Sequence, residues 1–168
     1  MSMILKIITT PNPLLAQKSK KISRVDDSIR KLAADMAETM ESYGDKHESG
    51  VAVAAIQVGV PLRMTVVKND EEGYTALINP EVVKHSNDEL EETEGCMSVP
   101  KKYGSVKRYK KIKVRGLDLD GKKVEIKAEG FKARVLQHEI DHMDGKLFLH
   151  KVAPQDLYTL TDDGKLVK

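Results

Sequence analysis

Two histidines four residues apart are the part of this sequence best suited to chemistry. His138 and His142 lie in the segment QHEIDH, residues 137–142. On an α-helix, positions i and i+4 share one face, so both imidazoles can reach a single point. Two imidazoles at this spacing supply two ligands of a catalytic metal site, and the adjacent Glu139 can take up or release a proton. The segment therefore predicts a metal centre with a carboxylate beside it.

The residues around this segment have the apolar pattern of a buried helix. Gly130 can begin the helix and Gly145 can end it. Two apolar stripes follow the helical period, Phe131, Val135, His138 and His142 on one side and Ala133, Leu136, Ile140 and Met143 on the other. A helix that is apolar on two sides is usually buried between two layers. We therefore expect the histidines to lie inside the protein.

A catalytic metal typically takes three protein ligands, so the sequence must supply one more. Downstream of His142 the candidates are His150 and four aspartates, at positions 144, 156, 162 and 163. Cys96 is the stronger candidate, because a thiolate is a soft donor and the neighbouring Gly95 lets the backbone approach closely. A lone cysteine is more often a small buried apolar residue. The missing ligand favours Cys96 as a metal ligand here.

The composition limits the class of protein. With 168 residues, 40% of them apolar and 32% charged, the chain is expected to form one soluble globular domain over residues 1–168. Two Phe and no Trp predict an aliphatic core and argue against stacking on nucleic-acid bases, and we expect no specific DNA binding. No apolar run approaches the length of a membrane span. The single cysteine excludes an internal disulfide and suits the reducing cytoplasm.

Charge is concentrated in two blocks although the net charge is only +2. Residues 88–94 carry five carboxylates, and residues 101–115 carry eight Lys and Arg. Solvated strand edges are the favoured interpretation of both blocks. A weak RNA contact is the alternative for the basic one.

Apolar periodicity predicts the remaining elements. Capping residues at 25–28 precede an amphipathic helix that ends near Gly44. Residues 44–50 form a polar loop in which His47 is expected to be solvated, and residues 50–59 form a small apolar segment suited to close packing. Strands are expected at 3–8, 62–67, 75–78, 81–85, 111–115, 124–128 and 147–152, with a hairpin turn at 118–121. The predicted class is α+β, with antiparallel strands packed around a central helix that carries HEIDH and with an N-terminal amphipathic helix.

Three separated motifs resemble those of the peptide deformylases, in the same order. They are GVAVAAIQ at 50–57, EGCMS at 94–98 and QHEIDH at 137–142. The family patterns are G-x-G-x-A-A-x-Q, E-G-C-x-S and H-E-x-D-H. The resemblance extends over roughly residues 3–152. It implies an enzyme that removes the formyl group from N-formylmethionyl nascent peptides, with transient ribosome association and no membrane contact.

The resemblance also implies roles for individual residues. The metal ligands would be Cys96, His138 and His142, holding one divalent ion that is natively Fe²⁺ in many members, with Zn²⁺, Ni²⁺ or Co²⁺ as alternatives. Glu139 would be the general base and acid, and Gln57 and the backbone N–H of Met97 would bind the formyl oxygen. The peptide would run along Gly50, Val51, Ala52 and Gly95. Supporting roles fall to Gln137 and Ser98, which would orient a histidine and the cysteine loop, and to an Arg108–Asp141 ion pair.

Two features depart from the family pattern. Ala52 stands where the family usually has its second glycine, so its methyl group can crowd the substrate, or strain the backbone if φ is positive. The chain after residue 150 also lacks the pattern of the long basic helix with which many bacterial members dock on the ribosome.

Two other classes of protein remain as alternatives. A zinc metallopeptidase shares H-E-x-x-H but requires a carboxylate or histidine as third ligand. A non-catalytic relative would bind a metal or a nascent peptide without turnover, its pocket closed by Ala52.

Overall fold

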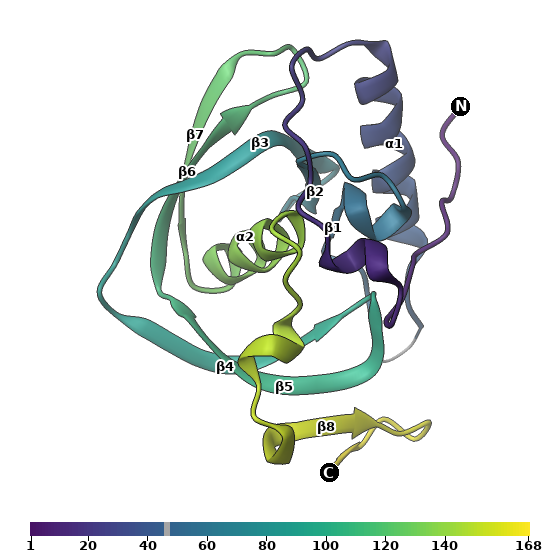
Figure 1. The fold of residues 1–168 in the computed structure, drawn as a ribbon, viewed down its shortest axis with the longest axis vertical. Coiled ribbons are helices and arrows are strands. Elements are labelled where there is room, and N and C mark those ends of the chain that lie inside the picture. Colours follow the sequence, from purple (N-terminus) through teal and green to yellow (C-terminus); the bar gives the residue numbers. More distant parts are fainter. Residues whose placement is uncertain (46–47) are drawn as a thin grey trace.

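The computed structural model describes residues 1–45 and 48–168, so the expectation for His47 lies outside the described residues. Two α-helices and two antiparallel sheets make up this part of the chain (Figure 1). The five-stranded sheet has the order β1 (Ala52–Ala54), β2 (Met64–Lys68), β3 (Tyr74–His85), β6 (Lys111–Leu117) and β7 (Lys123–Glu129). The four-stranded sheet has the order β4 (Glu89–Cys96), β5 (Val99–Tyr109), β8 (Leu157–Leu160) and β9 (Leu166–Val167). The expected mixture of helices with antiparallel strands is confirmed, and no helix within the described ranges has the length and apolarity needed to cross a membrane.

Helix α2 (Gly130–Met143) lies between the sheets, with strands on several sides of it in Figure 1. Leu136 and Ile140 pack into an aliphatic cluster with residues of β3, β6 and β7. The helix ends at Met143 with Asp144 as its C-cap, and Gly145 follows with φ 73°. A Cβ at Gly145 would lie 2.5 Å from the carbonyl oxygen of Ala16, so both the backbone conformation and the space require glycine. Phe131, expected on a buried stripe, is 66% exposed because the first turn of α2 reaches the surface.

Helix α1 (Asp27–Ser42) covers β1 and β2. The Asp26 carboxylate caps its N-terminus by accepting hydrogen bonds from the backbone N–H groups of Ser28 and Ile29. Its buried side recurs at the helical period through Ile29, Ala33, Met36 and Met40. The helix thus closes the aliphatic core over the strand that precedes Gln57.

Residues 3–8 do not form the expected strand. Their backbone N–H groups find partners in α1 side chains and in two loops instead of a strand. The bonds run from Met3 to the Asp35 carboxylate, from Leu5 to the Thr39 hydroxyl, from Ile8 to the Gln57 carbonyl and from Thr10 to the Ser98 carbonyl. The first ten residues therefore tie α1 to the loops after β1 and β4.

Other boundaries also differ from expectation. The strands expected at 75–78 and 81–85 are one strand, β3, with a bulge where Asn79 adopts φ 52°. The Asn79 amide holds this bulge by bonding both the N–H and the carbonyl of Ile22, each at 2.8 Å. Residues 147–152 contain a 3₁₀ turn, Phe148–Lys151, in place of a strand, because the Leu147 N–H donates to Nδ1 of His150 rather than to a neighbouring strand.

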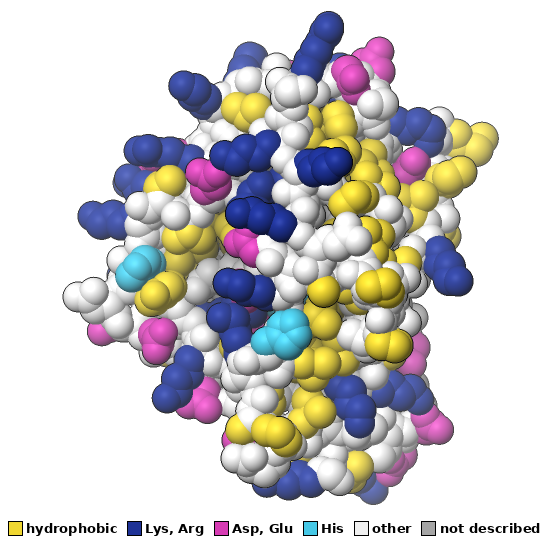
Figure 2. Space-filling view, in the orientation of Figure 1, with side chains coloured by type: hydrophobic (Ala, Val, Ile, Leu, Met, Phe, Trp, Pro, Cys, Tyr) yellow, Lys and Arg dark blue, Asp and Glu magenta, His cyan; other side chains and the backbone are white. Residues whose placement is uncertain are grey.

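The two charged blocks largely face each other. Strands β4 and β5 pair so that Glu91 lies opposite Lys107. Other basic side chains of the block reach acids elsewhere, as Lys101 does to Asp162 and Arg115 to Glu125. Figure 2 shows Lys and Arg spread over the surface in that view, with Asp and Glu among them. The exposed members of both blocks agree with solvated strands. The prediction is wrong for Glu94 and Arg108, which are 6% and 4% exposed, and β5 is an inner strand of its sheet.

Candidate metal centre

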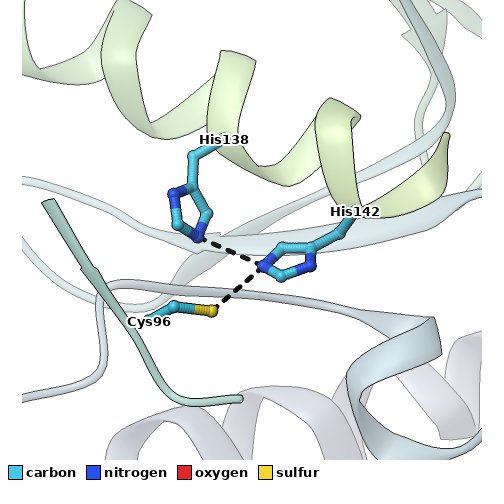
Figure 3. A group of neighbouring side chains, drawn as sticks. All are labelled: Cys96, His138 and His142. Atoms are coloured by element: carbon cyan, nitrogen blue, oxygen red, sulfur yellow. Dashed lines mark hydrogen bonds between the residues drawn. The ribbon is translucent and has the colours of Figure 1, made fainter. Parts of the chain in front are cut away.

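Three side chains with metal-binding atoms converge between α2 and the end of β4 (Figure 3). His138 and His142 point down from consecutive turns of α2, and Cys96 ends β4 below them. Nε2 of His142 lies 3.2 Å from Sγ of Cys96 and 3.2 Å from Nε2 of His138. Ligand atoms around one tetrahedral ion with Zn–N and Zn–S bonds lie roughly 3.4 Å apart. The spacing therefore suits a single divalent ion held by all three residues.

The protonation of the histidines supports the same conclusion. Nδ1 of His138 lies 3.0 Å from Oε2 of Glu94, which holds the proton on Nδ1 and leaves the Nε2 lone pair facing Cys96 and His142. Burial lowers the pKa of His138, but hydrogen bonds with Cys96 and Glu94 outweigh it and raise that pKa well above its usual value. Burial and the neighbouring His138 lower the pKa of His142 well below its usual value. Neutral imidazole is the form that binds a metal, so the lowered pKa of His142 keeps its ring available as a ligand.

Glu139 is buried next to these ligands and lines the same cavity. Its Oε2 has no hydrogen-bond partner among the described residues. Burial raises the pKa of the Glu139 carboxyl to about 7, against the opposing effect of His138. A carboxyl with that pKa can both accept and release a proton near neutral pH.

Gln57 holds a fixed amide orientation on the other side of the cysteine. The Ala54 N–H donates to its Oε1 at 2.9 Å, which turns the Nε2 amide toward Sγ of Cys96 at 3.6 Å and Oγ of Ser98 at 3.2 Å. Met97 follows Cys96 in the turn between β4 and β5 and lines the cavity with Gln57. Ser98 is completely buried, and its hydroxyl accepts from the Gln57 amide, which joins the turn after Cys96 to Gln57.

A cavity of about 280 Å³ opens onto these groups. Val51, Ala52 and Gly95 line it, as expected for residues along a substrate path. Ala52 lies inside strand β1, at the edge of its sheet, so its backbone is extended and the concern about a positive φ does not apply. Gly50 lies outside the lining, where a Cβ would meet the Met40 carbonyl oxygen at 2.2 Å. Glycine at position 50 therefore serves close packing against the end of α1.

An ionic network supports the histidines from behind. Nη1 of Arg108 lies 2.5 Å from Oδ2 of Asp141, the ion pair expected from the resemblance. Glu94 is the acceptor at its centre, bonding Arg108, Arg134 and His138. Burial favours the neutral form of Glu94, but the hydrogen bonds from Arg108 and His138 hold its pKa well below the usual range. The motif EGCMS contains Glu94 but predicts no role for it. Arg134 lies outside all three motifs, and its only signal in the sequence is its place four residues before His138.

The side-chain hydrogen bonds of Gln137 within the described residues go to β5 and to its own helix, and none goes to a histidine. Its amide bonds both the N–H and the carbonyl of Tyr109 on β5, at 3.1 and 2.9 Å, and also the Ala133 carbonyl. Gln137 therefore joins α2 to β5 in place of the histidine orientation expected for it.

Comparison with known proteins gives consistent matches. The family model described as polypeptide deformylase matches residues 4–157. A peptide deformylase of Symbiobacterium thermophilum is 45% identical over 164 residues, covering 96% of this chain and 72% of the relative. The crystal structure of a peptide deformylase from Legionella pneumophila superposes with a TM-score of 0.84 at 41% identity, covering 91% of this chain and 88% of that one. A Met-Ala-Ser-bound structure from Acinetobacter baumannii has a TM-score of 0.82 at 32% identity, covering 90% of this chain and all (100%) of that one.

Proposed function

The chain belongs to the polypeptide deformylase family, and on that premise we propose that it is a metal-dependent hydrolase releasing formate from the formyl-methionine of nascent peptides. Cys96, His138 and His142 would hold the ion. We propose Fe²⁺ as the native ion, and Zn²⁺, Ni²⁺ and Co²⁺ suit the same thiolate and imidazole donors. The single observation that carries the proposal is the convergence of this donor set beside Glu139 and Gln57.

The reaction can be followed through the residues of the chain. A bound divalent ion would lower the pKa of a water molecule and polarise the formyl oxygen. Glu139, which is buried beside the ligands and whose Oε2 has no hydrogen-bond partner among the described residues, would take the proton from the attacking water and pass it to the leaving amine nitrogen. The Gln57 amide and the Met97 N–H would donate to the oxygen of the tetrahedral species, where negative charge accumulates. The products are formate and a free N-terminal amine.

The substrate class follows from the cavity. The small side chain of Ala52 would leave room for a small acyl group in the cavity that Cys96 also lines, and Val51 and Phe131 add apolar surface for the methionine side chain and the residues after it. The Acinetobacter relative binds Met-Ala-Ser, the peptide that deformylation of formyl-Met-Ala-Ser would leave. We propose that this chain acts as one domain, in the cytoplasm, on peptides still close to the ribosome. Residues 157–160 and 166–167 form β8 and β9.

The test is formate release from formyl-Met-Ala-Ser by Fe²⁺- or Ni²⁺-loaded protein handled without oxygen, with metal content measured on the same sample. One equivalent of metal and formate produced in step with free amine would support the proposal. Metal-loaded protein that binds the peptide without producing formate would contradict it. Cys96→Asp separates the metallopeptidase alternative, which predicts that both metal and activity survive the change.

A further inference from the structure

Arg134 is a buried charge for which the proposed reaction has no use. Its side chain is 6% exposed, and it stands one turn before His138 on the same face of α2. The guanidinium donates four hydrogen bonds, from Nε to Glu92 at 2.9 Å, from Nη1 to Glu94 at 2.8 Å and to the Val106 carbonyl at 2.9 Å, and from Nη2 to the Leu90 carbonyl at 2.7 Å. A buried arginine with so many partners is held in one geometry.

These partners join two elements that carry different metal ligands. Three of the four acceptors belong to β4, the strand that ends at Cys96, and the fourth belongs to β5. Arg134 itself belongs to α2, which carries His138 and His142. One rigid side chain therefore spans the gap that the metal would also span.

Glu94 transmits this restraint to a ligand. Its Oε1 accepts from Nη1 of Arg134 and from Nε of Arg108, each at 2.8 Å, and its Oε2 accepts from Nη2 of Arg108 and from Nδ1 of His138, each at 3.0 Å. Without Arg134, Arg108 would still hold both carboxylate oxygens. Strand β4 would nevertheless lose the guanidinium that fixes its distance from α2, and with it the restraint on where Glu94 meets His138.

We propose that Arg134 is a positioning residue of the metal centre, which acts by clamping Glu94 and so aligns His138 with Cys96 and His142. The inference rests on the proposed metal site. Arg134 also lines the cavity, so a direct contact with substrate is the competing explanation.

The experiment compares four variants of the full chain: R134M, R134K, E92Q and R115M. R134M removes the guanidinium and all four of its hydrogen bonds. R134K keeps the positive charge, but a single ammonium cannot reach Glu94 and two carbonyls together. E92Q weakens only the half-exposed outer partner, whose side chain is 51% exposed. R115M is the matched control, because Arg115 makes an exposed ion pair with Glu125 outside the cavity. For each variant we would measure Co²⁺ affinity by chelator competition, the absorption spectrum of the Co²⁺ form, thermal unfolding, and kcat and KM.

We expect R134M to weaken Co²⁺ binding by roughly 10–100-fold, the usual effect of removing a group that orients a ligand, and to alter the Co²⁺ spectrum. R134K should give an intermediate loss, E92Q a smaller loss than R134M, and R115M none. Activity should fall through kcat rather than KM. If R134M does not fold, the affinity and spectrum of R134K decide the matter.

Three results would overturn the proposal. Wild-type Co²⁺ affinity and spectrum in a less stable R134M or R134K would make Arg134 purely structural. A rise in KM with kcat and Co²⁺ affinity unchanged would make it a substrate contact. Equal losses in E92Q and R134M would assign the effect to the outer ion pair. The cobalt measurements need no turnover, so a protein that binds Co²⁺ as expected but releases no formate would refute the proposed function and leave this inference standing.

Discussion

The most informative perturbation of the site is at Gln57. Its amide has two separable roles. Oε1 accepts from the Ala54 N–H, which supports the fold, and Nε2 faces Cys96 and Ser98, where it would act in catalysis. Leucine at this position removes both roles. Glutamate keeps an oxygen for Ala54 but replaces the amide donor.

The structure sets the size of each effect. Loss of a donor to a developing oxyanion typically costs about 2.7–4 kcal/mol of barrier, or about 10²–10³ in kcat. Loss of the acceptor leaves the Ala54 N–H buried and unpaired, which costs about 1–3 kcal/mol of stability. We therefore expect Q57L to lose both kcat and stability, whereas Q57E loses kcat with a smaller stability change. S98A removes one Nε2 partner but leaves the amide held by Ala54, so its loss of kcat should be the smallest.

The assay is steady-state formate release on Ni²⁺-loaded variants with the metal content measured, together with urea unfolding of the same samples. Wild-type kcat in a folded, metal-loaded Q57E would refute the role of the amide as an oxyanion donor. A loss that appears only in KM would assign Gln57 to substrate binding instead. Equal effects of S98A and Q57L would show that the Ser98 hydroxyl is the group that matters.

The remaining predictions use other parts of the molecule. Glu139→Gln should lower kcat by about 10²–10⁴ while metal content, measured by atomic absorption, stays at the wild-type level; unchanged kcat would exclude Glu139 as the base. Removing the metal by chelation should lower the free energy of unfolding by about 2.7 kcal/mol relative to protein in metal at 100 times Kd, and equal melting temperatures with and without metal would contradict binding to the folded state. The Lys31 hydrogen bond lowers the pKa of Asp35 in the folded protein, so the stability that Asp35 contributes is present above its unfolded pKa of about 3.9 and is lost as pH falls through the lower folded-state pKa. Asp35→Asn should therefore cost about 1 kcal/mol at pH 7 in urea unfolding, with the gap from wild type narrowing toward pH 3; a constant gap would contradict this account.

Local chemistry made part of the fold predictable. The hairpin of β6 and β7 follows from strict alternation and from an Asp118 turn, where the carboxylate accepts from the N–H groups of residues 120 and 122. The same holds for α1, whose cap and apolar period are both local. The sequence predicts the backbone conformation incorrectly where a residue far away in the chain determines it. Asn79 continues β3 through a predicted turn because Ile22, 57 residues away, satisfies its amide.

The candidate site shows the same division. The pairing of His138 and His142 could be predicted from their spacing, because a helix places residues i and i+4 on one face. Arg134 carries no such signal, since its four acceptors lie on strands 28–44 residues away. Phe131 belongs to an apolar stripe at the helical period and is nevertheless exposed. The period identifies one face of the helix, but it does not show which turn of that face reaches solvent.

The hydrogen bonds of residues 8 and 10 affect the order in which the protein can fold during synthesis. Ile8 and Thr10 bond the carbonyls of Gln57 and Ser98, so they hold loops on both sides of the thiolate. During synthesis Thr10 is translated well before Ser98, so its N–H cannot make this bond until the chain has been extended to Ser98. The segment that carries Ile8 and Thr10 can therefore reach its final position only after β4 and the turn that follows it have been made.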